Sequence, residues 1–91
     1  MRYFLITDEE DSLIGLRLAG IEGVLAQSRA DCIREIEKAV RDRDIAVLII
    51  SKSLAALCPE QVEQLRRDAA SPLIVEIPAR IGRGTHGFHH G

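Results

Sequence analysis

The stretch Pro72-Leu73-Ile74-Val75-Glu76-Ile77-Pro78 reads as one complete strand with a proline at each end. A short apolar run rich in β-branched residues is typical of a strand that is covered on both faces. Proline fits poorly into continued strand pairing or into a helix interior. The sequence therefore predicts that this strand closes a sheet, and Glu76 is the one charge inside it, facing solvent at an edge, a cation or a partner.

Two earlier runs have the same character. Residues Tyr3 to Thr7 are mostly apolar and end abruptly in Asp8-Glu9-Glu10-Asp11, and residues Ile45 to Ile50 form an uninterrupted aliphatic segment. Both are too short for an independent helix, so we predict two further buried strands. A weaker strand candidate is Val24-Leu25-Ala26-Gln27.

Helical patterns separate these strands. The most regular one spans residues 29 to 42, where apolar residues recur every three or four positions, and Ser28 with Asp31 resembles a capping box at its start. A first helix is expected to be capped by Asp11 or Ser12 and to end at Gly20. Its apolar surface is assigned to Leu13, Ile14, Leu16 and Leu18.

A last helical segment precedes the final strand. It is predicted to start at Ser51 or Ser53 and to restart at Pro59, because proline suits the first position of a helix. The element order is then β-α-β-α-β-α-β, which with right-handed crossovers gives a parallel sheet. We predict an α/β fold with four parallel strands in the order 2-1-3-4 and helices on both faces, like the receiver and flavodoxin folds without their fifth strand.

The composition indicates one domain followed by a tail. The chain has 91 residues, so residues 1–78 are expected to fold and the glycine- and histidine-containing residues 79–91 to be flexible. A net charge of −2 and three aromatic residues disfavour binding to nucleic acid or to an anionic membrane. No apolar run is long enough to span a bilayer and no signal-peptide pattern opens the chain, so a cytoplasmic location is expected.

The carboxyl ends of the strands are where parallel sheets collect ligands, which makes Thr7, Asp8, Glu9 and Ser51 the candidates for a site. A phosphate-accepting receiver domain also has paired acids after its first strand, but it needs an aspartate where this chain has Ser51 and a lysine after a fifth strand. A glycine-rich phosphate loop is also absent. The preferred interpretation is that the acidic loop caps the first helix.

The cysteines and histidines give no dedicated site. Cys32 and Cys58 lack metal-ligand spacing and are predicted to be reduced thiols that pack like small hydrophobic residues, and no second cysteine is expected beside Cys58. His86, His89 and His90 would share one face of a helix, but the glycines around them disfavour a helix, so only adventitious affinity for Ni²⁺ or Zn²⁺ is expected. We predict no catalytic residue, no cofactor and no metal.

Taken together, the segments resemble the F subunits of the V-type and A-type ATP synthases, which are proteins of the central rotor stalk. The resemblance covers about residues 1 to 78. It depends most on the Gly-Leu-Arg-Leu-Ala-Gly-Ile stretch at residues 15–21 and on the Val-Glu-Ile-Pro ending at residues 75–78. It is supported by Ile6-Thr7-Asp8-Glu9 and by the aliphatic run from Ile45 to Ser51.

This resemblance implies a non-catalytic protein that binds the coiled-coil D subunit of the rotor and helps to couple ATP synthesis or hydrolysis to ion transport. It implies a cytoplasmic protein that reaches the membrane only through the complex, and it gives Arg17 and Glu76 roles as polar contacts to the partner. The alternative is a degenerate receiver-like domain for signalling or small-ligand binding that uses the loop from Thr7 to Asp11. Self-association of the isolated chain through an unpaired sheet edge is a further expectation.

The chain departs from the resemblance after Pro78. Family members usually continue into a C-terminal helix, whereas this sequence changes to glycine and histidine. Two interpretations stay open: a short variant that keeps the partner-binding domain, or a sequence that lacks its natural end.

Overall fold

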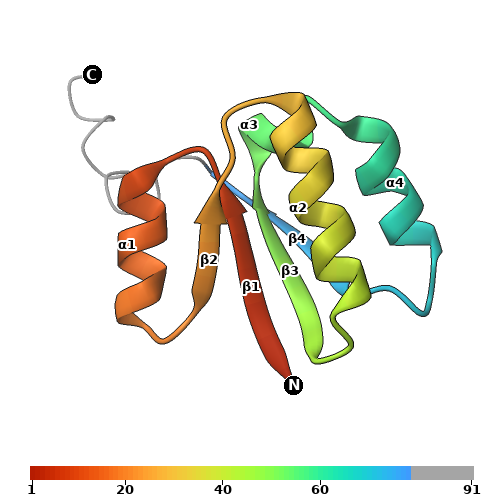
Figure 1. Cartoon of the computed structure of the whole chain (residues 1–91), viewed down its shortest axis with the longest axis horizontal. Coiled ribbons are helices and arrows are strands. Elements are labelled where there is room, and N and C mark those ends of the chain that lie inside the picture. The colour runs from red at the N-terminus through yellow and green to blue at the C-terminus, as the bar shows by residue number, and fades with distance from the viewer. Residues whose placement is uncertain (79–91) are drawn as a thin grey trace.

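The computed structural model describes residues 1–78, which form alternating strands and helices. The elements are β1 (Arg2–Thr7), α1 (Glu10–Leu18), β2 (Glu22–Leu25), α2 (Arg29–Arg41), β3 (Ile45–Ser51), α3 (Lys52–Ala55), α4 (Pro59–Arg67) and β4 (Leu73–Ile77). The four strands run parallel in the order β2-β1-β3-β4 (Figure 1). The predicted fold class and strand order are therefore confirmed.

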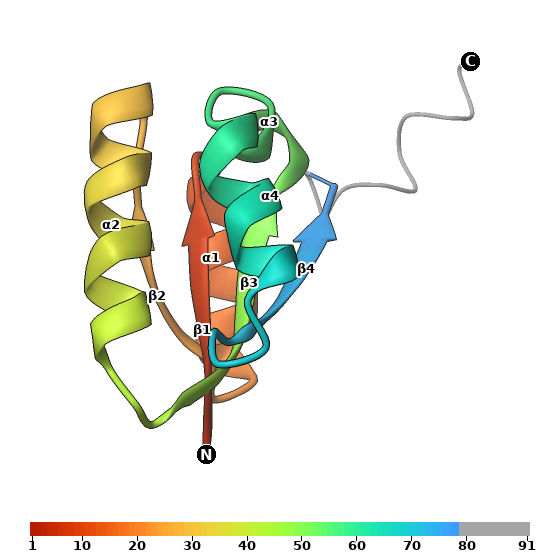
Figure 2. The ribbon, with the colours of Figure 1, turned by 90° about the vertical axis from the view of Figure 1, so that its right-hand side faces the viewer.

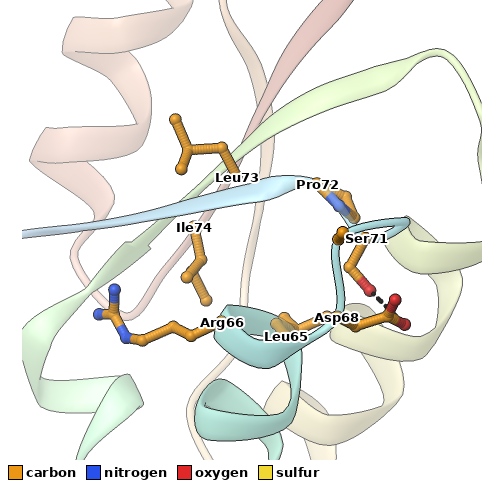
Figure 3. Close-up of a pocket in the computed structure, with 8 residues that line it drawn as sticks. Leu65, Arg66, Asp68, Ser71, Pro72, Leu73 and Ile74 are labelled. Carbon is orange, nitrogen blue, oxygen red and sulfur yellow. Dashed lines mark hydrogen bonds between the residues drawn. The ribbon is translucent and has the colours of Figure 1, made fainter.

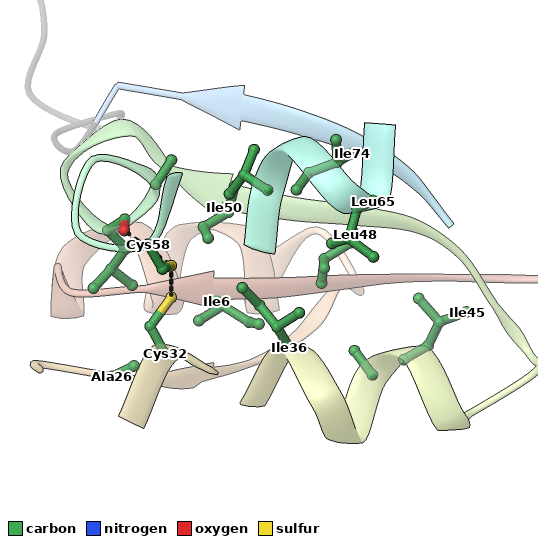
Figure 4. Close-up of a cluster of buried hydrophobic side chains, with 14 residues drawn as sticks. Ile6, Ala26, Cys32, Ile36, Ile45, Leu48, Ile50, Cys58, Leu65 and Ile74 are labelled. Atoms are coloured by element: carbon green, nitrogen blue, oxygen red, sulfur yellow. Dashed lines mark hydrogen bonds between the residues drawn. The ribbon is translucent and has the colours of Figure 1, made fainter. Parts of the chain in front are cut away.

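The larger core lies on the face of the sheet that α2, α3 and α4 cover (Figure 4). In Figure 2, α2 lies to the left of β1, β3 and β4. Ile6, Leu48 and Ile50 point into this core from the two central strands, and Ile36 and Leu65 meet them from α2 and α4. The periodic apolar positions predicted for residues 29 to 42 thus do face the sheet, because one stripe of a helix can be buried while the rest stays in water.

The opposite face has a much smaller core. Leu5, Leu13 and Ile49 are its buried members, and α1 contacts mainly β1 and β2. The prediction that all four apolar residues of the first helix line its buried surface was wrong, since Ile14 and Leu18 are exposed. The helix presents Leu13 and Leu16 to the sheet, and the other two lie on its outer side. One short helix therefore covers only part of this face.

The ends of α1 differ in part from expectation. The helix begins at Glu10, and Glu9 is its N-cap residue without a side-chain capping bond, so neither Asp11 nor Ser12 is the cap. Thr7 fixes this turn instead, since its Oγ1 accepts a hydrogen bond from the Glu9 amide at 3.1 Å. After the helix, Gly20 has φ of 89°, which confirms the predicted left-handed position.

The predicted cap of α2 is present. The Ser28 side-chain oxygen accepts a hydrogen bond from the Asp31 amide at 3.1 Å. Replacing Ser28 by alanine is expected to lower the free energy of unfolding by about 1 kcal/mol, because one amide of the first turn loses its partner. Urea unfolding followed by circular dichroism measures the change. The matched control is Ser28→Asn, which keeps a capping oxygen. Equal losses in the two variants would contradict the assignment.

Candidate functional site

The polar residues at the carboxyl end of the sheet do come together. Ser51 Oγ donates a hydrogen bond to Asp8 Oδ1 at 3.1 Å, and Ser53 Oγ donates to Asp8 Oδ2 at 2.7 Å. The two hydroxyl oxygens are 3.4 Å apart. Thr7 and Ser51 are fully buried, whereas Asp8 is only partly so. The cluster joins the end of β1 to the start of α3.

This cluster has the chemistry of a structural contact. Both oxygens of Asp8 accept from serine hydroxyls, and no histidine occurs in residues 1–78 to act as a base toward either serine. The aspartate that a receiver domain needs is replaced by Ser51, which is bound to Asp8. Among residues 1–78 no group of three metal-ligating side chains lies close together. The prediction singled out Asp8 and Ser51 as site residues, but it missed Ser53. Its position in the first turn of α3, two residues after Ser51, was the signal that could have indicated it.

Replacing Asp8 by alanine is expected to lower the free energy of unfolding by about 1.5 kcal/mol, because the buried Ser51 hydroxyl loses its acceptor. Chemical denaturation of the purified protein measures it. Glu37→Ala removes an exposed carboxylate from α2 and serves as the control, with little change expected. A loss no larger than that of the control would show that the Asp8 contacts do not stabilise the fold.

Glu76 is held by an ion pair within the chain. Its Oε2 accepts a hydrogen bond from Arg66 Nη2 at 2.8 Å, which connects β4 to α4. The register places Glu76 beside Ile50, so it lies on the face that α4 covers. Arg17 is exposed on α1, and no ion-pair partner for it occurs within residues 1–78. The two residues that the resemblance assigned to partner contacts therefore lie on different faces of the sheet.

A sheet face that residues 1–78 leave open is the most distinctive surface of the molecule. The register places Tyr3, Val47, Leu73 and Val75 on the same side as the small core, where Val47 is partly buried against that core and the other three are exposed. Leu73 is 66% exposed, Tyr3 47% and Val75 38%. Figure 3 shows Leu73 and Ile74 pointing to opposite sides of β4. The expectation that the last strand is covered on both faces was therefore wrong for residues 1–78. We call these four residues the open sheet face.

Two hollows on the surface give less indication of a binding site than the open sheet face does. A shallow hollow of about 390 Å³ lies where the turn after α4 meets β4 (Figure 3). Its carboxylate, Asp68, accepts hydrogen bonds from the Ala70 amide at 2.9 Å and from the Ser71 hydroxyl at 3.1 Å. These contacts fix the turn, so the acid is already used by the fold. A groove of about 550 Å³ between α2 and α4 is lined by Val40, Gln64 and their neighbours and is equally open.

The fold and these contacts define a small parallel α/β domain whose polar clusters stabilise turns and whose apolar sheet face is left open by residues 1–78. A sequence model of the family described as ATP synthase (F/14-kDa) subunit matches residues 4–89, and the chain belongs to this family. The chain is also 26% identical over 78 residues to the F subunit of the A-type ATP synthase of Methanothermobacter thermautotrophicus, in an alignment that covers 85% of this chain and 73% of that protein.

The predicted resemblance to the F subunits is thereby confirmed, but its extent needs correction. The family match continues past Pro78 to residue 89, so it is not confined to residues 1–78. The predicted tail and its three histidines lie outside the residues that the structure describes. No helix among the described residues is long and apolar enough to cross a membrane.

Proposed function

We propose that this chain is a non-catalytic component of the central stalk of a V-type or A-type ATP synthase, and that it acts by binding the coiled-coil D subunit. It thereby helps to couple ATP synthesis or hydrolysis to ion transport. The protein is cytoplasmic in this proposal and is peripheral to the membrane as part of the complex. Family membership supports the assignment to the complex, and the open sheet face is the observation that supports partner binding.

The open sheet face belongs to a parallel sheet. Parallel sheets are almost always covered on both faces, and an exposed cluster of large apolar side chains marks an interaction surface. Leu73 and Val75 belong to β4, the edge strand, and Tyr3 and Val47 extend the same surface across β3 to β1. A helix of a coiled coil carries an apolar stripe of comparable shape. The open sheet face therefore suits such a helix.

In this proposal Arg17 and Glu76, the two polar residues that the resemblance names, contribute less to binding than the apolar residues. Arg17 is exposed on α1, the helix on the same side of the sheet as the open sheet face, and there we assign it a contact at the rim of the interface. Glu76 lies at the edge strand with one oxygen bound to Arg66, and we assign it a contact to a partner that reaches around this edge. Because rim charges add little affinity, the apolar residues supply most of the binding energy.

Co-expression with the coiled-coil D subunit of the same organism tests the proposal directly. We expect a one-to-one complex on size exclusion, with affinity measured by calorimetry. A chain that neither forms this complex nor recovers any ATP synthase component from native extract would overturn it. Mg²⁺-dependent chemical-shift changes at Asp8, together with acyl-phosphate labelling, would instead favour the receiver-like alternative. If the open sheet face binds a second copy of this chain instead, size exclusion shows a homodimer.

A further inference from the structure

The two cysteines lie against each other in the larger core. Cys32, in the first turn of α2, and Cys58, directly before α4, have their sulfur atoms 3.3 Å apart, and both side chains are fully buried (Figure 4). The sequence prediction of packed, reduced thiols is consistent with their free state. The expectation that no second cysteine lies beside Cys58 was wrong. Since the residues are 26 positions apart, only the tertiary fold brings them together.

We propose that Cys32 and Cys58 are a redox-sensitive pair that forms a reversible disulfide between α2 and the start of α4. The bond requires the sulfurs to approach to about 2.05 Å. Cys58 Sγ now lies 3.4 Å from the Leu54 carbonyl oxygen, to which it donates a weak hydrogen bond, and oxidation would remove that donor. The crosslink would fix the helices on one side of the sheet and leave the open sheet face unchanged, so it is independent of the proposed function.

The oxidant is a small disulfide such as glutathione disulfide. One cysteine thiolate attacks it, forming a mixed disulfide and releasing one glutathione thiolate. The second cysteine then displaces the other glutathione, so two protein thiols lose two protons and two electrons and two glutathione thiols form.

The reduced pair is protected while the domain stays closed. Burial is the main reason that the pKa of the Cys32 thiol is raised to about 12, and the contact with Cys58 adds to it. Cys32 is therefore protonated at neutral pH and reacts slowly. Access requires local opening, and the segment beside Cys58 is suited to it: α3 has only 4 residues, and Leu57 in the following turn is exposed. The pair is thus expected to respond to sustained oxidation rather than to brief exposure.

The test compares the full chain, folded and in denaturing urea, after equilibration in the same glutathione redox buffers at mildly alkaline pH. Acid quenching and peptide mass spectrometry give the ratio of Cys32–Cys58 disulfide to dithiol. The ratio is expected to be roughly 300-fold higher in the folded protein, in line with the entropy of closing a loop of this length. The oxidised protein should also unfold at a urea concentration higher by about 1 to 2 M.

Single variants provide the control. Cys32→Ala and Cys58→Ala can form only a mixed disulfide with glutathione, and their urea midpoints should not rise on oxidation. The comparison of folded with unfolded wild-type chain needs no variant, so it is decisive even if a variant folds poorly. A disulfide ratio in the folded protein equal to or below that in urea, or mixed disulfides alone, would overturn the proposal.

Discussion

Val75→Glu is expected to weaken the proposed binding of the D subunit by about 30-fold or more, the effect of losing one hot-spot residue of an interface. The valine is exposed on the edge strand, between Leu73 and Ile77 on the same side of β4. A glutamate there would have to lose its hydration against an apolar helix, which costs free energy unless a cation pairs with it. Calorimetry or a co-purification assay with the coiled-coil partner measures the loss.

The chain offers a close control for this change. Val40 lies on α2, on the other side of the sheet, and is 37% exposed, against 38% for Val75. Val40→Glu should leave the affinity unchanged within a factor of about two, while circular dichroism verifies that both variants are folded. If Val75→Glu binds as tightly as Val40→Glu, the open sheet face is not where the coiled coil binds. If both lose binding, the partner contacts the α2 side as well.

The strands and their order could be predicted because each is encoded locally. The runs at Tyr3 and Ile45 are aliphatic and too short for helices, and the handedness of crossovers restricts how parallel strands can be ordered. The β2 strand was placed two residues late at its start, since Glu22 and Gly23 give no strand signal. The solvent exposure of the strand side chains was harder to predict, because an apolar run looks the same in the sequence whether one or both of its faces are covered. The exposure of Leu73 was not predicted for this reason.

The pairings of Glu76 with Arg66 and of Cys32 with Cys58 could not be predicted because they join distant positions. Glu76 was interpreted as facing solvent at an edge, a cation or a partner, without a choice between them, and the structure shows that the cation is Arg66 of α4, which pairs with it across the turn before β4. Cys32 and Cys58 meet only because α2 and α4 pack on the same face of the sheet. Pair distances of this kind follow from how crossover helices lie on the sheet, and the local pattern of residue types carries no information about them.

Gly23 is the strongest example of a constraint that the residue pattern conceals. It pairs with Leu5 across β1 and β2, and α1 packs over the same point. A Cβ atom at Gly23 would lie 2.7 Å from the Leu5 carbonyl oxygen, 2.8 Å from Leu5 Cβ and 3.0 Å from Leu13 Cδ1. The first two atoms belong to or are fixed by the backbone of a central strand, so they cannot move aside at low cost. The absent side chain allows the edge strand to approach β1 closely beneath the helix.

Gly23→Val is therefore expected to lower the free energy of unfolding by about 3 kcal/mol, at the upper end for overpacking, because β2 must move away from β1. Strand propensity alone predicts the opposite sign, since valine favours strands and glycine does not. Gly15→Ala is the control: nothing lies within 4 Å of its added Cβ on α1, and it should raise stability by about 0.5 to 1 kcal/mol. Urea unfolding of the two variants beside the wild type measures both signs. A Gly23→Val protein as stable as the wild type would mean that β2 can shift freely, and that the small core under α1 does not depend on the close pairing of these two strands.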